Sequence, residues 1–202
     1  SGKFISTDTS VFAKAKQSEG VDAVFFDANN DGAPDLYVVS GGNQYDDNDA
    51  NLADHLYMND GKGHFALAEA ALPAMLKNKS CVSVSDIDKD GDLDLFVGGL
   101  ADAKRFGIAQ PSYLLLNDGK GNFKQADGSV IKSGNLGIVT SASFTDLNND
   151  GWNDLVVAGE WMAVKIFMNK NGRFTASEIQ ASTGLWQTIY TTDINGDGFT
   201  DI

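Results

Sequence analysis

The sequence predicts an all-β protein, a β-propeller built of four-stranded antiparallel blades, with about three and a half blades present in this chain. Three observations predict this fold: an aspartate-rich loop that occurs four times, a glycine-rich motif that recurs between the loops, and short β-branched and aromatic runs beside each loop. Glycine is frequent, with 22 residues, and proline is rare, with 3, which is typical of short strands joined by turns.

The aspartate-rich loop shows that the chain is an array of similar units. Its copies share the pattern D-x-[DN]-x-D-G-x-x-D-[LI] and align without gaps. A pattern that recurs at such a spacing is typical of proteins built from stacked structural repeats. We number the loops 1 to 4 in chain order, and they span residues 27–35, 86–94, 146–154 and 193–201.

The second motif, which we call the hairpin motif, consists of an apolar run, an asparagine, a glycine-rich turn and a phenylalanine. It occurs at residues 56–65, 114–123 and 166–174, and residues 2–4 match its final part. The stretch Asn-Asp-Gly-Lys-Gly in its first two copies predicts a hairpin turn between two strands. The motif's phenylalanines divide one partial propeller over residues 1–202 into repeat units of approximately 4–64, 65–122, 123–173 and, incomplete, 174–202.

Short strands are predicted on both sides of each loop. The runs before the loops are 21–26, 81–85, 140–145 and 188–192, and the runs after loops 1 to 3 are 36–39, 95–98 and 155–158. The second set is apolar at successive positions, as expected of strands that lie between two neighbouring sheets. Two strands at the loop and two at the hairpin motif make one four-stranded blade.

The loops also predict metal sites. Positions 1, 3, 5 and 9 carry side-chain oxygens, and position 6 is always glycine, which permits a sharp turn at positive φ. Position 7 varies, so we expect it to contribute only its backbone carbonyl. Six or seven hard oxygen ligands favour Ca²⁺ over Mg²⁺, and the absence of His and Cys from the loops argues against Zn²⁺ and copper.

We therefore expect up to four bound Ca²⁺ ions. Loop 2 has four liganding aspartates, whereas each of the others has three and an asparagine, so loop 2 is expected to bind most tightly. The predicted ligands are Asp27, Asn29, Asp31, Ala33 and Asp35 in loop 1; Asp86, Asp88, Asp90, Asp92 and Asp94 in loop 2; Asp146, Asn148, Asp150, Trp152 and Asp154 in loop 3; and Asp193, Asn195, Asp197, Phe199 and Asp201 in loop 4.

The loops differ from two similar patterns. An EF-hand has glutamate at its twelfth position, where this chain has Val38, Val97 and Val157, and a helix after the loop, where this chain predicts a strand. The other alternative is a set of Asx-rich turns that bind no metal. Four copies in register favour the metal sites over that alternative.

The loops and their strands resemble FG-GAP/VCBS repeats, the units of integrin-α-type β-propellers. Residues 156–169 and 182–186 further resemble large secreted bacterial repeat proteins that carry an ASPIC/UnbV domain, although no such domain is present in this chain. The resemblance implies a seven-bladed propeller with Ca²⁺ loops on one face and an extracellular or cell-envelope location. It also implies a role in binding or adhesion to a protein or glycan.

Charge and composition exclude several classes of partner. The formal net charge of −13 disfavours nucleic-acid binding, and no apolar run is long enough to insert into a membrane. The single cysteine, Cys81, is expected to be a small packed residue. The chain is expected to gain further blades from the same protein or from self-association, because an open arc of blades leaves apolar sheet faces bare.

No catalytic residue is predicted. His55 and His64 have no nucleophile that a motif pairs with them, and both are expected at the surface. Glu160 and Trp161 could form part of a surface site, but an aromatic residue packed between blades is the favoured interpretation. A carbohydrate-active propeller enzyme, a lyase or hydrolase, is the alternative to a binding module.

Overall fold

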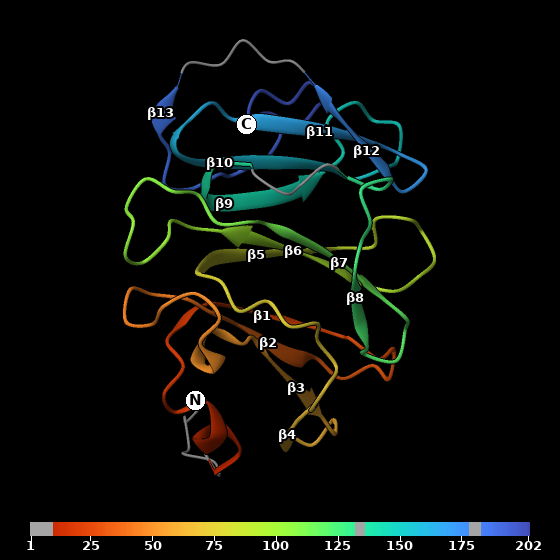
Figure 1. The fold of residues 1–202 in the computed structure, drawn as a ribbon. Coiled ribbons are helices and arrows are strands. Elements are labelled where there is room, and N and C mark those ends of the chain that lie inside the picture. The colour runs from red at the N-terminus through yellow and green to blue at the C-terminus, as the bar shows by residue number, and fades with distance from the viewer. Residues whose placement is uncertain (1–9, 132–135, 178–182) are drawn as a thin grey trace, which may run out of the picture.

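The computed structural model describes residues 10–131, 136–177 and 183–202. It contains three antiparallel sheets that are stacked in chain order, from the bottom to the top of Figure 1. The strand orders are β1-β2-β3-β4, β5-β6-β7-β8 and β12-β11-β10-β9, so each sheet is a meander, and β13 adds to one end of β10. The prediction of an all-β partial propeller is confirmed.

The strands are short. In the first sheet they are β1 (Gly20–Phe26), β2 (Asp35–Ser40), β3 (His55–Asn59) and β4 (Phe65–Leu67). In the second sheet they are β5 (Lys79–Ser85), β6 (Asp94–Gly99), β7 (Tyr113–Asn117) and β8 (Phe123–Gln125). In the third sheet they are β9 (Ile138–Thr145), β10 (Asp154–Met162), β11 (Lys165–Lys170), β12 (Arg173–Ser177) and β13 (Gly184–Leu185).

Helical structure is limited to two short 3₁₀ segments, η1 (Ser10–Ala15) and η2 (Ala50–Leu52), within the described residues. Among those residues, no helix is long and apolar enough to cross a membrane.

The second strand of the middle blade, β6, is sandwiched between two neighbouring sheets, as its apolar sequence predicts. Every residue of β6 is buried. Leu95 and Val97 pack into the core between the first two sheets, whereas Phe96 packs into the core between the second and third. Successive side chains of a strand point to opposite faces, so β6 supplies both cores. Cys81 is buried in the second of these cores, which agrees with its predicted packing role.

The hairpin motifs form the turns that their glycines predict. In the first two, backbone hydrogen bonds of 3.1 Å close the turn, from Asp60 N to His64 O and from Asp118 N to Asn122 O. The third is tighter: Lys170 pairs with Arg173, and the two residues between them have φ of 55° and 73°. Two positive φ values are the requirement of a two-residue turn that matches strand twist.

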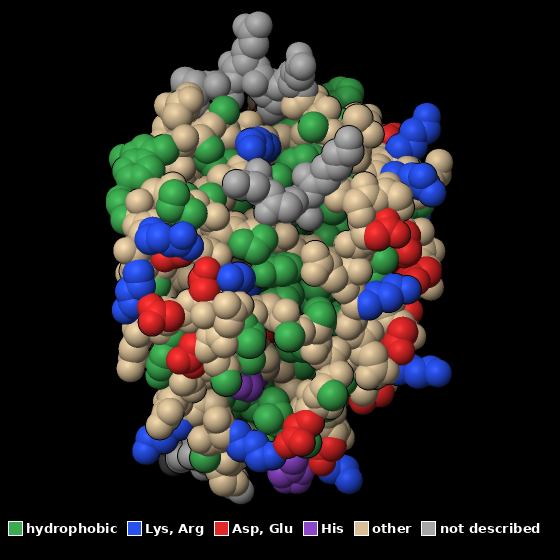
Figure 2. Space-filling view, in the orientation of Figure 1, with side chains coloured by type: hydrophobic (Ala, Val, Ile, Leu, Met, Phe, Trp, Pro, Cys, Tyr) green, Lys and Arg blue, Asp and Glu red, His purple; other side chains and the backbone are tan. Residues whose placement is uncertain are grey.

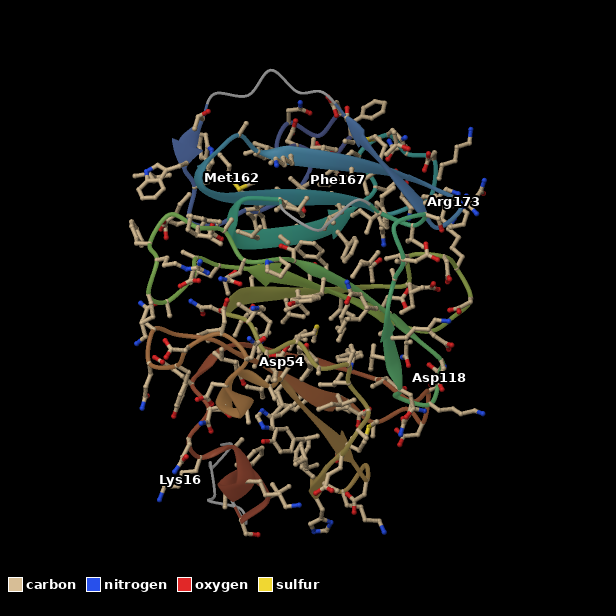
Figure 3. The ribbon with its side chains drawn as sticks, viewed as in Figure 1. Lys16, Asp54, Asp118, Met162, Phe167 and Arg173 are labelled. Atoms are coloured by element: carbon tan, nitrogen blue, oxygen red, sulfur yellow. The ribbon has the colours of Figure 1, made fainter. Side chains whose placement is uncertain are left out.

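A buried ion pair fixes the insertion after β2. Lys79 and Asp54 are both fully buried, with Lys79 Nζ 3.4 Å from Asp54 Oδ1. The ammonium group also donates to the carbonyls of Leu52, Met75 and Lys77 at 2.7, 2.7 and 2.8 Å. Asp54, labelled in Figure 3, accepts from Ser40 N and from the hydroxyl of Tyr37, both at 2.7 Å. Burial raises the pKa of Asp54 to about 6, although the charge of Lys79 opposes this shift.

This pair yields a stability prediction. Substituting Lys79→Met removes the cation from a buried carboxylate and leaves three carbonyls without their donor. Because breaking a buried pair leaves an uncompensated charge, we expect a loss of about 3–5 kcal/mol of unfolding free energy in urea titrations at pH 8. The matched control is Lys14→Met, which removes the exposed pair with Glu69 and is expected to change little.

The loss is also expected to depend on pH. The pKa of Asp54 is higher in the folded protein than in the unfolded chain, so the native protein keeps the Asp54 proton up to about pH 6. The stability that comes from this bound proton is lost as pH rises through that value. Without Lys79 the pKa rises further, so the loss continues above pH 6 and the deficit of the variant grows from pH 5 to pH 8. A deficit that is equal at both pH values, or that matches the Lys14→Met control, would contradict this account.

Candidate metal centre

The aspartate-rich loops lie together on one side of the molecule. Loops 1, 2 and 3 join β1 to β2, β5 to β6 and β9 to β10, and they lie along the right margin of Figure 1. Loop 4 is closed by an antiparallel bridge between Thr192 and Asp201. Acidic and basic side chains are both found along the right margin of the surface in Figure 2.

All four loops are folded by the same hydrogen bonds. The carboxylate at position 1 accepts from the amide of the glycine at position 6, which folds the chain back over its own start. The distances are 2.8 Å for Gly32 to Asp27, 3.1 Å for Gly91 to Asp86, 2.7 Å for Gly151 to Asp146 and 2.8 Å for Gly198 to Asp193.

The aspartate at position 9 joins the loop to the sheet. One of its oxygens accepts from the amide of position 2, at 2.9, 3.2, 3.1 and 3.0 Å in loops 1 to 4. In loops 1 to 3 the other oxygen accepts from the backbone amide of the hairpin-motif asparagine, which is the last residue of β3 and β7 and the last but one of β11. These second bonds are Asn59 to Asp35 at 2.7 Å, Asn117 to Asp94 at 2.9 Å and Asn169 to Asp154 at 2.7 Å.

These position 9 carboxylates are buried, with exposed fractions of 0%, 2% and 0% for Asp35, Asp94 and Asp154. Burial raises the pKa of all three, and that of Asp94 to about 7. The neighbouring carboxylates raise these pKa values further, while the backbone amides lower them. A buried, crowded carboxylate of this kind gains most from a nearby cation.

Two residues of each loop have left-handed backbone. The glycine at position 6 has φ between 85° and 94° in the four copies, as its predicted turn requires. Position 4 is left-handed as well, with φ of 59° at Asn30, 61° at Lys89, 57° at Asn149 and 79° at Gly196. Sequence reasoning missed this second position, although asparagine and glycine, which tolerate this conformation best, occupy three of its four copies.

The oxygens of loop 2 fit a divalent cation. Ligand atoms from Asp86, Asp88 and Asp94 all lie within 4.8 Å of one another. Asp86 Oδ1 is buried and accepts no hydrogen bond from any residue that the structure describes, so this oxygen is available to a cation. A set of carboxylate oxygens without histidine or cysteine has the chemistry that Ca²⁺ prefers.

Position 7 has a structural role in addition to the predicted one. Its amide donates to the position 5 carboxylate at 2.8 to 2.9 Å in all four loops. The side chain at position 4 of each of the first three loops also contacts position 6 or 7 of the next loop. Asn30 Nδ2 donates to Asp92 Oδ1 at 2.7 Å, Lys89 Nζ lies 4.3 Å from the centroid of the Trp152 ring, and Asn149 Nδ2 donates to Gly198 O at 2.8 Å.

The asparagine of the hairpin motif provides a second connection between loops. Asn117 Nδ2 donates to Ala28 O of loop 1 at 2.8 Å and to Leu93 O of loop 2 at 3.1 Å. Asn169 Nδ2 joins Ile87 O of loop 2 to Asn153 O of loop 3 at 2.8 and 3.1 Å. The sequence signal for this role is the asparagine that precedes every glycine-rich turn. The sequence pattern predicts only the turn itself.

Neither histidine belongs to the carboxylate cluster of loop 2. His64 is exposed, as expected, and its Nδ1 lies 2.8 Å from Asp60 Oδ2. The expectation is wrong for His55, which is half-buried because its ring stacks on Tyr57 with centroids 6.1 Å apart. Burial lowers its pKa, and the nearby charge of Lys79 lowers it further.

Comparison with known proteins agrees with the repeat architecture. The model of the FG-GAP-like repeat matches residues 27–97 and 146–202, which together make up more than half of the chain. A search of curated proteins gave no match. Among solved structures, the chain is similar to an Agrocybe aegerita lectin described as recognising non-reducing terminal N-acetylglucosamine, with 20% identity and a TM-score of 0.49.

That similarity covers 80% of this chain and 38% of the lectin chain, so the present chain corresponds to well under half of that protein's length. The family assignment rests on the repeat match, and its two ranges contain all four aspartate-rich loops. The chain belongs to the FG-GAP-like repeat family.

Proposed function

We propose that this chain is a calcium-binding β-propeller module that binds a protein or glycan ligand, with Ca²⁺ making the blade loops rigid. The observation that carries the proposal is the carboxylate cluster of loop 2, in which three aspartates converge and one buried oxygen of Asp86 accepts no hydrogen bond from the described residues. The other three loops repeat its backbone hydrogen bonds, which supports the same role for them.

Bound Ca²⁺ would act on more than the loop that holds it. Position 4 of each of the first three loops contacts position 6 or 7 of the next loop, and the hairpin asparagines join loop 1 to loop 2 and loop 2 to loop 3. An ion that fixes one loop therefore also restrains its neighbours. Removing the repulsion among carboxylates would further favour the folded arrangement, because the chain carries a formal charge of −13.

We place this module outside the cell or in the cell envelope. Calcium sites of extracellular modules often have dissociation constants of about 10⁻⁴–10⁻³ M, which suit millimolar external calcium. A rigid propeller then serves as a scaffold on which the longer connections, residues 42–54 and 100–112, present side chains to a ligand. We assign no catalytic role to any residue.

The first prediction of this proposal concerns stability. Calcium at millimolar concentration is expected to raise the melting temperature, and excess chelator to lower it. Binding to the native state alone stabilises by RT ln(1 + [L]/Kd), about 2.7 kcal/mol at a hundredfold excess over Kd and roughly 1 kcal/mol per site for weaker sites. Calorimetric melting with magnesium at equal ionic strength is the control. An identical melting temperature in calcium and chelator would refute the calcium role.

The second prediction ranks the loops. Asp88→Asn gives loop 2 the composition of loops 1, 3 and 4, so the highest-affinity calcium event should weaken by roughly tenfold as one ligand charge is lost. The reciprocal change, Asn29→Asp, should strengthen the site in loop 1. Isothermal calorimetry of both variants measures the change. A tightest event that survives Asp88→Asn unchanged would show that the ranking is wrong.

A further inference from the structure

Two exposed aromatic rings meet at the junction of the second and third blades. Phe106 lies in the connection after β6 and Trp161 near the end of β10, with exposed fractions of 75% and 54%. Their ring centroids are 5.2 Å apart and the rings are nearly perpendicular, at 84°. Phe106 follows β6, and Trp161 lies near the end of β10. Both strands begin at aspartate-rich loops, so the pair lies on the opposite side of the molecule from those loops.

The figures show the same placement. Hydrophobic side chains gather at the left margin of Figure 2, over the connection after β6 and the region of β13. Met162, the neighbour of Trp161, is labelled on the left in Figure 3, whereas Asp118 of the second hairpin motif is labelled on the right. The favoured interpretation of Trp161 as an aromatic residue hidden between blades is therefore wrong, because its ring lies at a blade junction but faces solvent.

The backbone of Trp161 is held in an unusual conformation. Its φ is 53°, in the left-handed region that a bulky aromatic side chain rarely adopts. Nearby, the indole of Trp186 donates to Met162 O at 3.1 Å, and β13 pairs with β10 at Glu160 and Met162, with an irregular register between them. Such outliers persist where surrounding contacts enforce them, and they occur often at ligand-binding positions.

A pocket of about 350 Å³ is lined by Phe106, whose ring contacts Trp161, and by Glu160, the neighbour of Trp161 in the sequence. Its walls come from three segments that are distant in sequence: the connection after β2, the connection after β6, and the third blade. The volume is at the lower end of the range for small-molecule sites, which suits a ligand of one or two rings. The residues that carry the argument are Asn43, Ala101, Asp102, Phe106, Ile138 and Glu160.

Some polar groups of this pocket are already hydrogen-bonded within the protein, and others can bond a ligand. Asp102 is buried and occupied: Arg105 donates to its Oδ2 from Nε and Nη2 at 3.0 and 2.6 Å, and the backbone amides of Lys104 and Arg105 donate to Oδ1. These bonds hold the pKa of Asp102 at about 2. Glu160 is half-buried, and the one side-chain hydrogen bond that it accepts from the described residues is a 3.4 Å contact from Gln187; Asn43 is exposed, so both can bond a ligand.

We propose that this pocket and the Phe106–Trp161 pair form a binding site for a neutral pyranose sugar, such as the terminal residue of a glycan. The inference rests on the proposed function of the chain as a binding module and names the surface and ligand class. A pyranose has an apolar C–H face that packs on the electron-rich face of an aromatic ring, and a rim of hydroxyls that donate to a carboxylate and accept from an amide.

The negative charge of the pocket favours neutral sugars over acidic ones. Glu160 and Asp102 both lie at the pocket, and the whole chain carries a formal charge of −13. Acidic sugars would meet like charge here, because no lysine or arginine is among the described residues that line the pocket and the guanidinium of Arg105 is bonded to Asp102. A neutral ligand avoids this repulsion and leaves Glu160 free to accept hydrogen bonds.

The test uses the intact chain in calcium-containing buffer and follows the indole N–H signals in nitrogen–proton correlation spectra. The probes are methyl β-glucopyranoside, methyl β-galactopyranoside, methyl α-mannopyranoside and methyl N-acetyl-β-glucosaminide. Trp161→Phe assigns the signal of interest, and Trp152, on the opposite side of the molecule, is the internal reference. At least one glycoside is expected to shift the Trp161 signal saturably and leave that of Trp152 unchanged.

Variants then locate the site. Phe106→Ala and Trp161→Ala are expected to weaken the binding of that glycoside by tenfold or more, measured by isothermal calorimetry because the second variant lacks the Trp161 signal. Tyr190→Ala removes an aromatic ring that is 80% exposed elsewhere and is expected to bind as the parent does. Phe106 lies on an exposed connection, so its removal tests the site even if Trp161→Ala alters the fold of β10.

The outcomes separate this inference from the calcium proposal. No saturable shift with any of the four glycosides, or binding that survives both alanine substitutions, overturns the sugar site, whatever calcium does to the melting temperature. A protein ligand that competes for the same rings while no glycoside binds also overturns it. Glycoside binding that persists in a protein insensitive to calcium would support the site and refute the calcium role.

Discussion

The structure depends on one buried carboxylate in each blade, the aspartate at position 9 of the loop. Asp35, Asp94 and Asp154 begin the second strands, and each accepts one amide from its loop and one from the third strand of its sheet. This side chain therefore holds the loop in a fixed position relative to the third strand of the sheet. Burial raises its pKa, so the arrangement has an electrostatic cost that a calcium ion would offset.

Much of this arrangement could be predicted from the sequence because the informative residues recur. The strands, the hairpins, the left-handed glycine and the oxygen-rich positions each follow from a residue type in a fixed place within the repeat. Contacts between repeats were not predictable in this way. The pairing of Asn30 with Asp92 and of Lys89 with Trp152 joins positions 4 and 7, which vary in type and are distant in sequence. The buried Lys79–Asp54 pair and the exposure of Trp161 likewise follow from packing between segments and not from local pattern.

The repeat also divides the molecule into two sides with different chemistry. One side carries the aspartate-rich loops, whose geometry is shared by all copies. The other carries the long connections, which differ in length and sequence from blade to blade. Shared geometry suits a common structural ion, and variable connections suit a specific ligand, as in other folds in which rigid scaffolds carry binding loops. The second strands, which join the two sides, pack into the cores between the sheets, so loops made rigid by an ion would hold the connections in place.

The most direct test of the central claim is the luminescence of Tb³⁺, a lanthanide ion that occupies calcium sites and emits when a nearby indole transfers energy to it. Trp152 is position 7 of loop 3, so an ion in that loop would lie beside its indole. The account predicts emission excited through tryptophan that Ca²⁺ displaces, Mg²⁺ displaces poorly, and Trp152→Phe largely removes. Absence of this emission, or emission that calcium does not displace, would contradict the assignment of the aspartate-rich loops as calcium sites.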